Sequence, residues 1–184
     1  MSETTWEPMQ EVKLIVLDVD GTLTDGSIVF GEAGEQGKTF HVADGLGIVM
    51  AKSVGMRIAV LSGRRSVAVE RRMSELGVSE VMQGVADKGA RLRALMDRLR
   101  LRPPEVAFVG DDINDLPAFN VVGVKIAVAD AAQIVRERAD YVTPRGGGRG
   151  GVRDAIDEIL RRQGRFDEAV QAYLSRPVTA VARQ

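Results

Sequence analysis

Apolar residues gather in short runs that alternate with segments of helical periodicity. Several runs are nearly unbroken and rich in β-branched residues, which is typical of strands buried on both faces. Elsewhere apolar side chains recur at i, i+3, i+4 and i+7, as between Leu92 and Leu99. We expect strands at 12–17, 56–61, 80–82, 105–109, 123–128 and 141–143. We expect helices at 44–53, with Asp44 as the helix cap, and at 89–99, 131–138, 152–163 and 166–174, together with two helices that end at about 76 and about 120. This alternation predicts an α/β fold, a Rossmann-like parallel sheet with helices on both faces.

Two β-prone runs, 27–30 and 38–42, enclose a Gly-rich stretch and predict a β-hairpin over about 27–42. The hairpin follows the first strand closely, so it is either a flap over that strand's end or an ordinary surface hairpin. We expect one domain over 11–164 that includes the hairpin, a C-terminal tail over 165–184, and a loose leader over 1–10.

Composition narrows the function classes. The net charge is −1, so no basic surface indicates nucleic acid as a partner. The chain has no cysteine and one histidine, which excludes thiol catalysis, disulfides, thiolate metal sites and multi-His zinc sites. A metal would be held mainly by oxygen, which suits magnesium. No apolar stretch approaches the length of a membrane span and no signal-peptide pattern is present, so we expect a cytoplasmic protein without membrane contact.

Polar clusters follow three of the predicted strands. Asp18 and Asp20 come after the first, Ser62 after the second, and an acidic cluster beginning at Asp111 after the third; Lys88 begins a helix elsewhere in the same pattern. Taken singly, each is more typical of a turn, a helix cap or a solvated residue. If the three strands are neighbours, one pocket gathers carboxylates, a hydroxyl and an ammonium. A divalent cation would offset the negative charge and leave a site suited to a phosphate dianion.

In order and spacing, these segments resemble the four motifs of haloacid-dehalogenase-type phosphatases. Further stretches resemble the small, capless, tetrameric subgroup that acts on phosphates of 3-deoxy-2-ulosonic sugar acids, and the resemblance covers about residues 11–172. The four motif segments are Asp18 to Thr22, Ser62 to Arg64, Lys88, and Gly110 to Asp115; the subgroup segments are 40–48, 128–131, 147–152 and 164–169.

The resemblance implies a role for each motif residue. Asp18 attacks phosphorus and carries an aspartyl-phosphate, and Asp20 acts as general acid and then as general base. Ser62 and Lys88 hold the transferring phosphoryl group. Magnesium, the implied cofactor, is held by Asp18, the backbone carbonyl of Asp20, and Asp111. Asp115 orients Lys88 or metal-bound water, and the supporting positions are Gly21, Thr22, Gly63, Asn114 and Asp115.

The implied substrate is a phosphorylated sugar acid, such as the 3-deoxy-D-manno-octulosonate 8-phosphate of lipopolysaccharide biosynthesis. Ala43 and Val49 depart from the pattern, because relatives often have basic residues there. A nine-carbon sugar acid phosphate, another sugar or nucleotide monophosphate, and a non-catalytic partner of a cytidylyltransferase are the alternatives. We expect substrate contacts from Asp20, Lys88, Arg64, Arg72 and the stretch His41, Val42, Ala43, Asp44 and Gly45, with His41 packing in the flap rather than transferring protons.

The resemblance also bears on assembly. The stretches between the motifs are too short for a cap domain, and capless members of the family usually complete their site by oligomerisation. The predicted hairpin carries apolar residues, and a lone two-stranded hairpin is marginal in water. We therefore expect a homotetramer in which hairpins of different subunits meet and a neighbour's tail approaches the pocket. The alternative is a monomer whose hairpin packs on its own sheet.

Overall fold

Six parallel strands lie side by side in the order β5-β4-β1-β6-β7-β8. The computed structural model describes residues 7–32 and 36–176. The strands are β1 (Leu14–Leu17), β4 (Arg57–Leu61), β5 (Glu80–Met82), β6 (Val106–Gly110), β7 (Val124–Ala127) and β8 (Tyr141–Val142). Every strand predicted for the sheet is present and every pairing between these strands is parallel, which confirms the predicted sheet.

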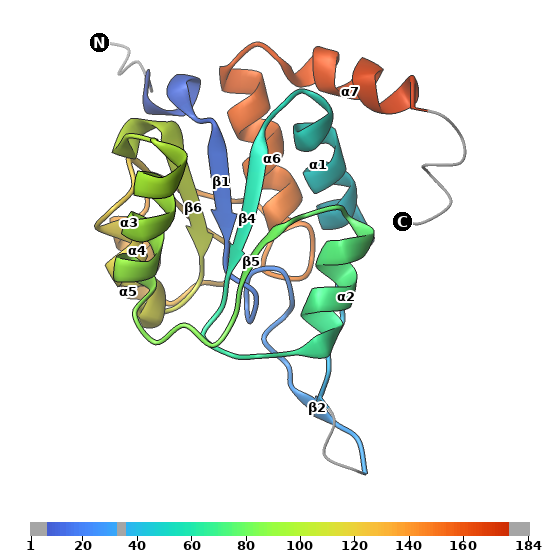
Figure 1. The fold of residues 1–184 in the computed structure, drawn as a ribbon, viewed down its shortest axis with the longest axis vertical. Helices are drawn as coiled ribbons and strands as arrows, with labels where there is room; N and C mark the ends of the chain where they lie inside the picture. Colours follow the sequence, from blue (N-terminus) through green and yellow to red (C-terminus); the bar gives the residue numbers. More distant parts are fainter. Residues whose placement is uncertain (1–6, 33–35, 177–184) are drawn as a thin grey trace.

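Helices cover both faces of this sheet (Figure 1). On one face lie α3, α4 and α5, and α1 and α6 pack against each other on the other face. The α-helices are α1 (Val42–Ser53), α2 (Val67–Glu75), α3 (Lys88–Leu99), α4 (Leu116–Phe119), α5 (Gln133–Arg138), α6 (Gly151–Arg162) and α7 (Phe166–Leu174); the 3-10 helices are η1 (Glu7–Glu11), η2 (Pro103–Glu105) and η3 (Ile113–Asp115). Among the helices of the described ranges, none is long and apolar enough to cross a membrane.

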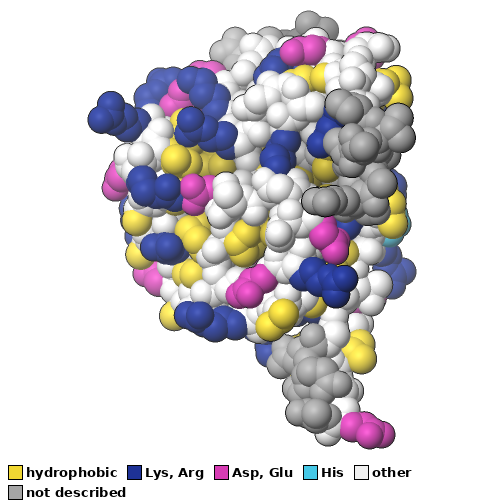
Figure 2. Space-filling model, turned by 45° about the vertical axis from the view of Figure 1, so that its right-hand side comes forward, with side chains coloured by type: hydrophobic (Ala, Val, Ile, Leu, Met, Phe, Trp, Pro, Cys, Tyr) yellow, Lys and Arg dark blue, Asp and Glu magenta, His cyan; other side chains and the backbone are white. Residues whose placement is uncertain are grey.

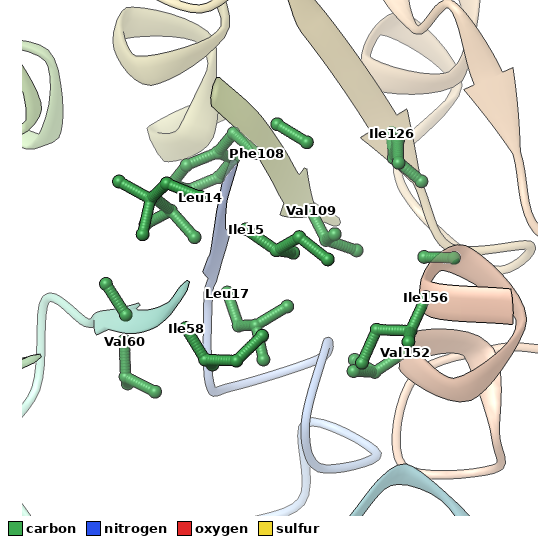
Figure 3. Close-up of a cluster of buried hydrophobic side chains, with 14 of the residues drawn as sticks. Leu14, Ile15, Leu17, Ile58, Val60, Phe108, Val109, Ile126, Val152 and Ile156 are labelled. Atoms are coloured by element: carbon green, nitrogen blue, oxygen red, sulfur yellow. The ribbon is translucent and has the colours of Figure 1, made fainter. Parts of the chain in front are cut away.

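The central strand β1 is buried along its whole length, which explains its unbroken apolar sequence. Successive side chains of a strand point to opposite faces of the sheet. On the α6 face, Ile15 and Val109 approach Ile156 (Figure 3). On the opposite face, Phe108 packs edge-on against Phe119 of α4, with ring centroids 6.1 Å apart. Both helix layers are thereby fixed to the strands that carry the predicted site.

The order β4-β1-β6 makes neighbours of the three strands that end in polar clusters. Leu17 is in register with Val60 of β4 and Val109 of β6, so the three strands end at nearly the same level. In a parallel sheet, ligands bind outside these carboxyl ends. The short β-hairpin of β2 (Val29–Phe30) and β3 (Gln36–Gly37) projects from this same end of the molecule (Figure 1).

The hairpin and the start of α1 differ from the prediction. The second strand is β3, ending at Gly37, whereas we expected a strand over 38–42. Asp44 was expected to cap the helix, but the helix begins at Val42 and His41 is its N-cap, with Nδ1 accepting from Ala43 N at 3.3 Å. Asp44 instead accepts from Arg153 N at 2.8 Å, which satisfies a donor in the first turn of α6.

Both ends of the chain carry helical structure. The leader, expected to be loose, includes η1, whose Met9 is buried because it packs into the core. The tail forms α7 as the periodicity predicted, and α7 packs on α1 and α6 at the end of the molecule opposite the hairpin (Figure 1). Val49 is buried on α1 and lines a hollow with Ala172 of α7, not the carboxyl ends of the strands. Residues 177–184 lie outside the described residues.

A Gly-rich loop before α6 contacts the turn after β1. Gly148 N donates to Thr22 O at 3.0 Å, and Gly147 N donates to Asp130 Oδ1 at 2.9 Å. The approach at Gly147 is so close that a Cβ there would lie 1.7 Å from Gly21 O. Only glycine permits this contact without a backbone shift.

We predict that Gly147→Ala lowers the free energy of unfolding by about 1–3 kcal/mol, because the added methyl group must displace backbone. The same shift moves the turn after β1, so turnover should fall with stability. Gly37→Ala is the matched control: a Cβ there meets only ordinary contacts near 3.7 Å, and its effect should stay within about 0.5 kcal/mol. Denaturant unfolding of the wild type and the two variants measures these free energies of unfolding. Equal stability of Gly147→Ala and Gly37→Ala would contradict the close contact at Gly147.

Candidate active site

A buried lysine lies between two carboxylates at the carboxyl ends of β1 and β6. Lys88 Nζ donates to Asp18 Oδ1 and to Asp115 Oδ1, each at 2.6 Å. All three side chains are almost fully buried. Lys88 is the first residue of α3, which Asp87 caps by accepting from Ala90 N at 2.9 Å. The capped helix start therefore fixes where the ammonium lies.

Asp115 is held on both of its oxygens. Oδ1 accepts from Lys88, while Oδ2 accepts from the backbone N–H groups of Asp111 at 2.9 Å and Asp112 at 3.4 Å. Gly110 leaves room for this carboxylate, because a Cβ there would lie 2.4 Å from Asp115 Oδ2. The carboxylate thus joins the loop after β6 to Lys88.

Asp111 lies against the turn that follows β1. Thr22 Oγ1 donates to Asp111 Oδ1 at 2.9 Å. Gly21 adopts a positive φ of 92°, and a Cβ at this position would lie 2.0 Å from Asp111 Oδ2. A side chain at this position would therefore push the carboxylate away.

Burial and the neighbouring charges shift the pKa values of Asp18, Asp111 and Lys88. Burial raises the pKa of Asp18 to about 6, with Asp115 adding to the effect and Lys88 opposing it. Burial, together with repulsion from Asp18 and Asp115, raises the pKa of Asp111 to about 8. Burial alone would lower the pKa of Lys88, but attraction to Asp18 and Asp115 outweighs it and the pKa is raised. The site therefore holds more negative charge than one ammonium offsets.

The donor set fits a hard divalent cation. Asp18, Asp111 and Asp115 each offer a carboxylate oxygen, and these atoms all lie within 4.8 Å of one another. Asp115 already bonds Lys88 and two backbone N–H groups, which leaves Asp18 and Asp111 as the better ligands. An all-oxygen set is what Mg²⁺ prefers.

A polar cavity of about 370 Å³ opens beside these carboxylates, and we call it the catalytic cavity. It brings together five of the residues predicted from the sequence: Asp20, Gly21, Arg64, Asp111 and Asn114. Its lining is completed by Asp112, which belongs to the predicted acidic cluster, and by residues that the sequence reasoning did not assign to the site, namely Asp25, Gly26, Ile28 and Asp130.

Ser62 follows β4 directly and is buried. Its backbone N–H donates to Met82 O at 2.9 Å, and its hydroxyl accepts from Arg64 N at 3.3 Å. The hydroxyl therefore lies in the turn through Gly63 that carries the chain to Arg64, which lines the catalytic cavity.

The remaining predicted substrate residues gather around the start of α1 and not in the catalytic cavity. Arg72 covers Gly45 so closely that a Cβ there would lie 2.3 Å from Nη2. Asp44 is buried; burial raises its pKa, and its Oδ2 lacks a hydrogen-bond partner among the described residues. Val42 is 78% exposed. Substrate contacts by His41 to Gly45 and by Arg72 stay a prediction.

Sequence reasoning missed one group that touches a predicted catalytic residue. Lys38, just after β3, donates its ammonium to Asp20 Oδ1. Its place in a strand of the predicted hairpin gave no sign that its side chain is buried. Asp130 had a signal, because it belongs to one of the segments that carried the family resemblance.

Comparisons with known proteins agree with this geometry. The model of the haloacid dehalogenase-like hydrolases matches residues 73–156. The chain is 43% identical over 160 residues to the 3-deoxy-D-manno-octulosonate 8-phosphate phosphatase KdsC of Escherichia coli, covering 87% of this chain and 85% of that protein.

Two solved structures are similar throughout. The 3-deoxy-D-manno-octulosonate 8-phosphate phosphatase of Moraxella catarrhalis, in complex with a magnesium ion, a phosphate ion and a KDO molecule, has a TM-score of 0.88 and 37% identity, covering 92% of this chain and 97% of that one. A HAD superfamily (subfamily III A) hydrolase from Legionella pneumophila has a TM-score of 0.90 and 36% identity, covering 94% of each chain.

The raised carboxylate pKa values predict how stability depends on pH after chelation. Between the ordinary value of 3.8 and values of about 6 and about 8, the folded state binds more protons at Asp18 and Asp111 than the unfolded state. The free energy of unfolding of the chelated protein should therefore fall as pH rises through this window. Magnesium should reverse most of the loss, because it binds the ionised carboxylates of the folded state.

Denaturant unfolding at pH 5 and pH 8, in chelator and in magnesium, measures this dependence. Asp111→Asn is the control, since it removes the most perturbed carboxylate and should flatten the pH dependence in chelator. A chelated wild-type protein whose stability is independent of pH and of magnesium would contradict the charge balance described above.

Proposed function

This chain belongs to the haloacid dehalogenase-like hydrolases, and we propose that it is a magnesium-dependent phosphatase that hydrolyses 3-deoxy-D-manno-octulosonate 8-phosphate. The observation that carries the proposal is Lys88, buried between Asp18 and Asp115, whose carboxylates lie close to that of Asp111 in the lining of the catalytic cavity. The substrate is supported by the relatives, whose 43% identity extends over most of the chain.

In the first step, a carboxylate oxygen of Asp18 attacks phosphorus. A bond forms between that oxygen and phosphorus while the bond from phosphorus to the sugar oxygen breaks. Asp20, two residues beyond Asp18 and facing the catalytic cavity, gives its proton to the departing oxygen. With a pKa of about 6, Asp18 is ionised at neutral pH and ready to attack.

In the second step, the aspartyl-phosphate is hydrolysed. Asp20, now ionised, takes a proton from a water molecule, and the water oxygen bonds to phosphorus. The bond between phosphorus and the Asp18 oxygen breaks, which releases phosphate and restores both aspartates. Asp20 thus serves as acid and then as base within one cycle.

The approach of a dianion to a carboxylate requires positive charge beside the nucleophile. The ammonium of Lys88 offsets the charge of Asp18, and Asp115 keeps it in place. Asp18, Asp111 and the backbone carbonyl of Asp20 would hold Mg²⁺, which when bound stabilises the negative charge that builds up on the phosphoryl group. The Ser62 hydroxyl would donate to a phosphoryl oxygen, and Arg64 would meet the sugar acid in the catalytic cavity.

The active form is proposed to be a homotetramer assembled through the hairpins. Val29 is 57% and Phe30 66% exposed, although both are large and apolar. In Figure 2, hydrophobic side chains lie at the surface close to where the hairpin leaves the body of the molecule. Hairpins of neighbouring copies would bury these side chains. Because α7 lies at the end of the molecule opposite the hairpin, the α7 that approaches the cavity would be that of a neighbouring copy. A cytoplasmic location also stays a prediction.

We predict that Asp18→Asn loses turnover by several orders of magnitude without losing the fold, since the nucleophile is replaced by a neutral group. Asp97→Asn, an exposed aspartate on α3, is the matched control and should keep full activity. Phosphate release is measured with 3-deoxy-D-manno-octulosonate 8-phosphate, a nine-carbon sugar acid phosphate, a hexose phosphate and a nucleotide, and unfolding curves check the fold.

Two outcomes of this panel would contradict different parts of the proposal. Steady-state activity of Asp18→Asn near that of the wild type would overturn the reaction. A wild-type preference for the hexose phosphate or the nucleotide would overturn the substrate class and leave the reaction standing.

Light scattering at micromolar concentration tests the assembly and should give four times the mass of one chain. Replacing Val29 and Phe30 with serine together should lower that mass, because the apolar contact between hairpins is lost. Ile134→Ser, a partly exposed apolar residue on α5, serves as the control and should leave the mass unchanged. A wild-type mass of one chain would refute the tetramer.

A further inference from the structure

Lys38 lies between the hairpin and the body of the molecule. It directly follows β3, and two residues later Phe40 packs against the core. Although its backbone lies near the surface, the Lys38 side chain is only 1% exposed. Its ammonium turns inward and donates to Asp20 Oδ1.

A buried ammonium requires a partner. Removing a charge from water costs several kcal/mol unless an opposite charge or acceptor compensates. In the described part of the chain, the ammonium of Lys38 pairs with Asp20, and the Asp20 side chain remains 21% exposed toward the catalytic cavity. The pair is therefore asymmetric: the lysine depends on the aspartate, while the aspartate keeps contact with solvent.

We propose that Lys38 is a positioning residue for Asp20. The inference rests on the proposed role of Asp20 as general acid and base. By binding Oδ1, Lys38 restricts rotation of the carboxyl group and directs Oδ2 into the catalytic cavity, where the leaving oxygen and the attacking water must each meet it. A general acid needs hydrogen-bond geometry to the reacting atom, so a carboxyl group held on one oxygen reacts more often than a freely rotating one.

The position of Lys38 also gives the hairpin a part in the reaction. On one side of Lys38 the chain is fixed by β2–β3 pairing, and on the other by Phe40 and by His41, the N-cap of α1. The carboxyl group of Asp20 is thus held through the segment that joins the hairpin to the first helix. Any displacement of the hairpin that carries Lys38 with it releases Asp20.

A double-mutant cycle with Lys38→Met and Asp20→Asn tests the proposal. Asparagine keeps an oxygen acceptor for Lys38 but has no acidic proton to transfer to the leaving group. If Lys38 acts through Asp20, adding Lys38→Met to Asp20→Asn should cause no further loss, whereas independent effects would multiply.

The readout is kcat/KM for the sugar acid phosphate and for p-nitrophenyl phosphate. This ratio reports the steps up to departure of the leaving group, and a nitrophenolate departs without a proton. We expect Lys38→Met to lower kcat/KM for the sugar acid phosphate by about 10- to 100-fold, part of the roughly 10²–10⁴-fold that general acid–base catalysis supplies. The loss for p-nitrophenyl phosphate should be about twofold or less, since that reaction bypasses the acid.

Three further measurements sharpen the test. Lys38→Gln keeps a hydrogen-bond donor and should retain more activity than Lys38→Met. It replaces Lys38→Met in the double-mutant cycle if the methionine variant does not fold. Lys125→Met removes a lysine that pairs with Asp140 away from the cavity, and should leave both ratios unchanged. Inhibition by inorganic phosphate should be the same in Lys38→Met and wild type.

The outcomes separate this inference from the proposed function. If Asp20→Asn itself loses equally on both substrates, the acid–base assignment of Asp20 fails and the inference falls with it. The other result is that Asp20→Asn loses activity mainly on the sugar acid phosphate, as expected for a missing general acid. In that case, a Lys38→Met variant with wild-type activity, or one whose loss multiplies with that of Asp20→Asn, overturns only the positioning role of Lys38. Weaker inhibition by phosphate in Lys38→Met would likewise overturn it in favour of direct anion binding.

Discussion

The ion pairs of Lys88 with Asp18 and Asp115 are the interaction on which the rest of this site depends. A buried ammonium is tolerated because two carboxylates accept from it at 2.6 Å. The same contact offsets the charge of the nucleophile, so that an anionic substrate can approach it. Because Asp115 also accepts from the backbone of Asp111 and Asp112, the lysine ties the loop after β6 to the end of β1. The ammonium of Lys88 thereby fixes the loop after β6 relative to β1 and also offsets the charge of the nucleophile.

The sheet order makes that contact possible, and small residues permit its closeness. Strand β1 lies between β4 and β6, so the residues that follow the three strands meet at one edge. Gly21 and Gly147 let the turn after β1, the Asp111 carboxylate and the loop before α6 approach within distances that exclude a side chain. Negative charge then accumulates in a small volume, as the raised pKa values of Asp18 and Asp111 express. Hydrophobic packing of the strands fixes the positions of these carboxylates, and their combined negative charge favours the binding of a cation.

Much of this arrangement follows from the sequence. The period of the apolar runs predicted the parallel sheet, and the polar residues after the runs predicted the edge where Asp18 and Asp111 meet. The place of Lys88 at this edge followed from the family resemblance. The sequence could not predict contacts set by tertiary packing. Asp44 was assigned as a helix cap from its residue type, but His41 caps α1 and Asp44 serves α6 instead. The contact of Lys38 with Asp20 could not be predicted for a similar reason, since nothing in the local sequence distinguishes a buried lysine near a hairpin from a solvated one.

In the proposed mechanism Asp18 itself attacks phosphorus, so that the phosphoryl group is transferred twice. Each in-line displacement inverts the configuration at phosphorus, and two displacements restore it. The direct measurement is the stereochemical course of hydrolysis of a thiophosphate ester of the sugar acid made chiral with oxygen isotopes. We expect retention of configuration in the released thiophosphate. Inversion would mean that water attacks the substrate directly, and would contradict the nucleophilic role of Asp18.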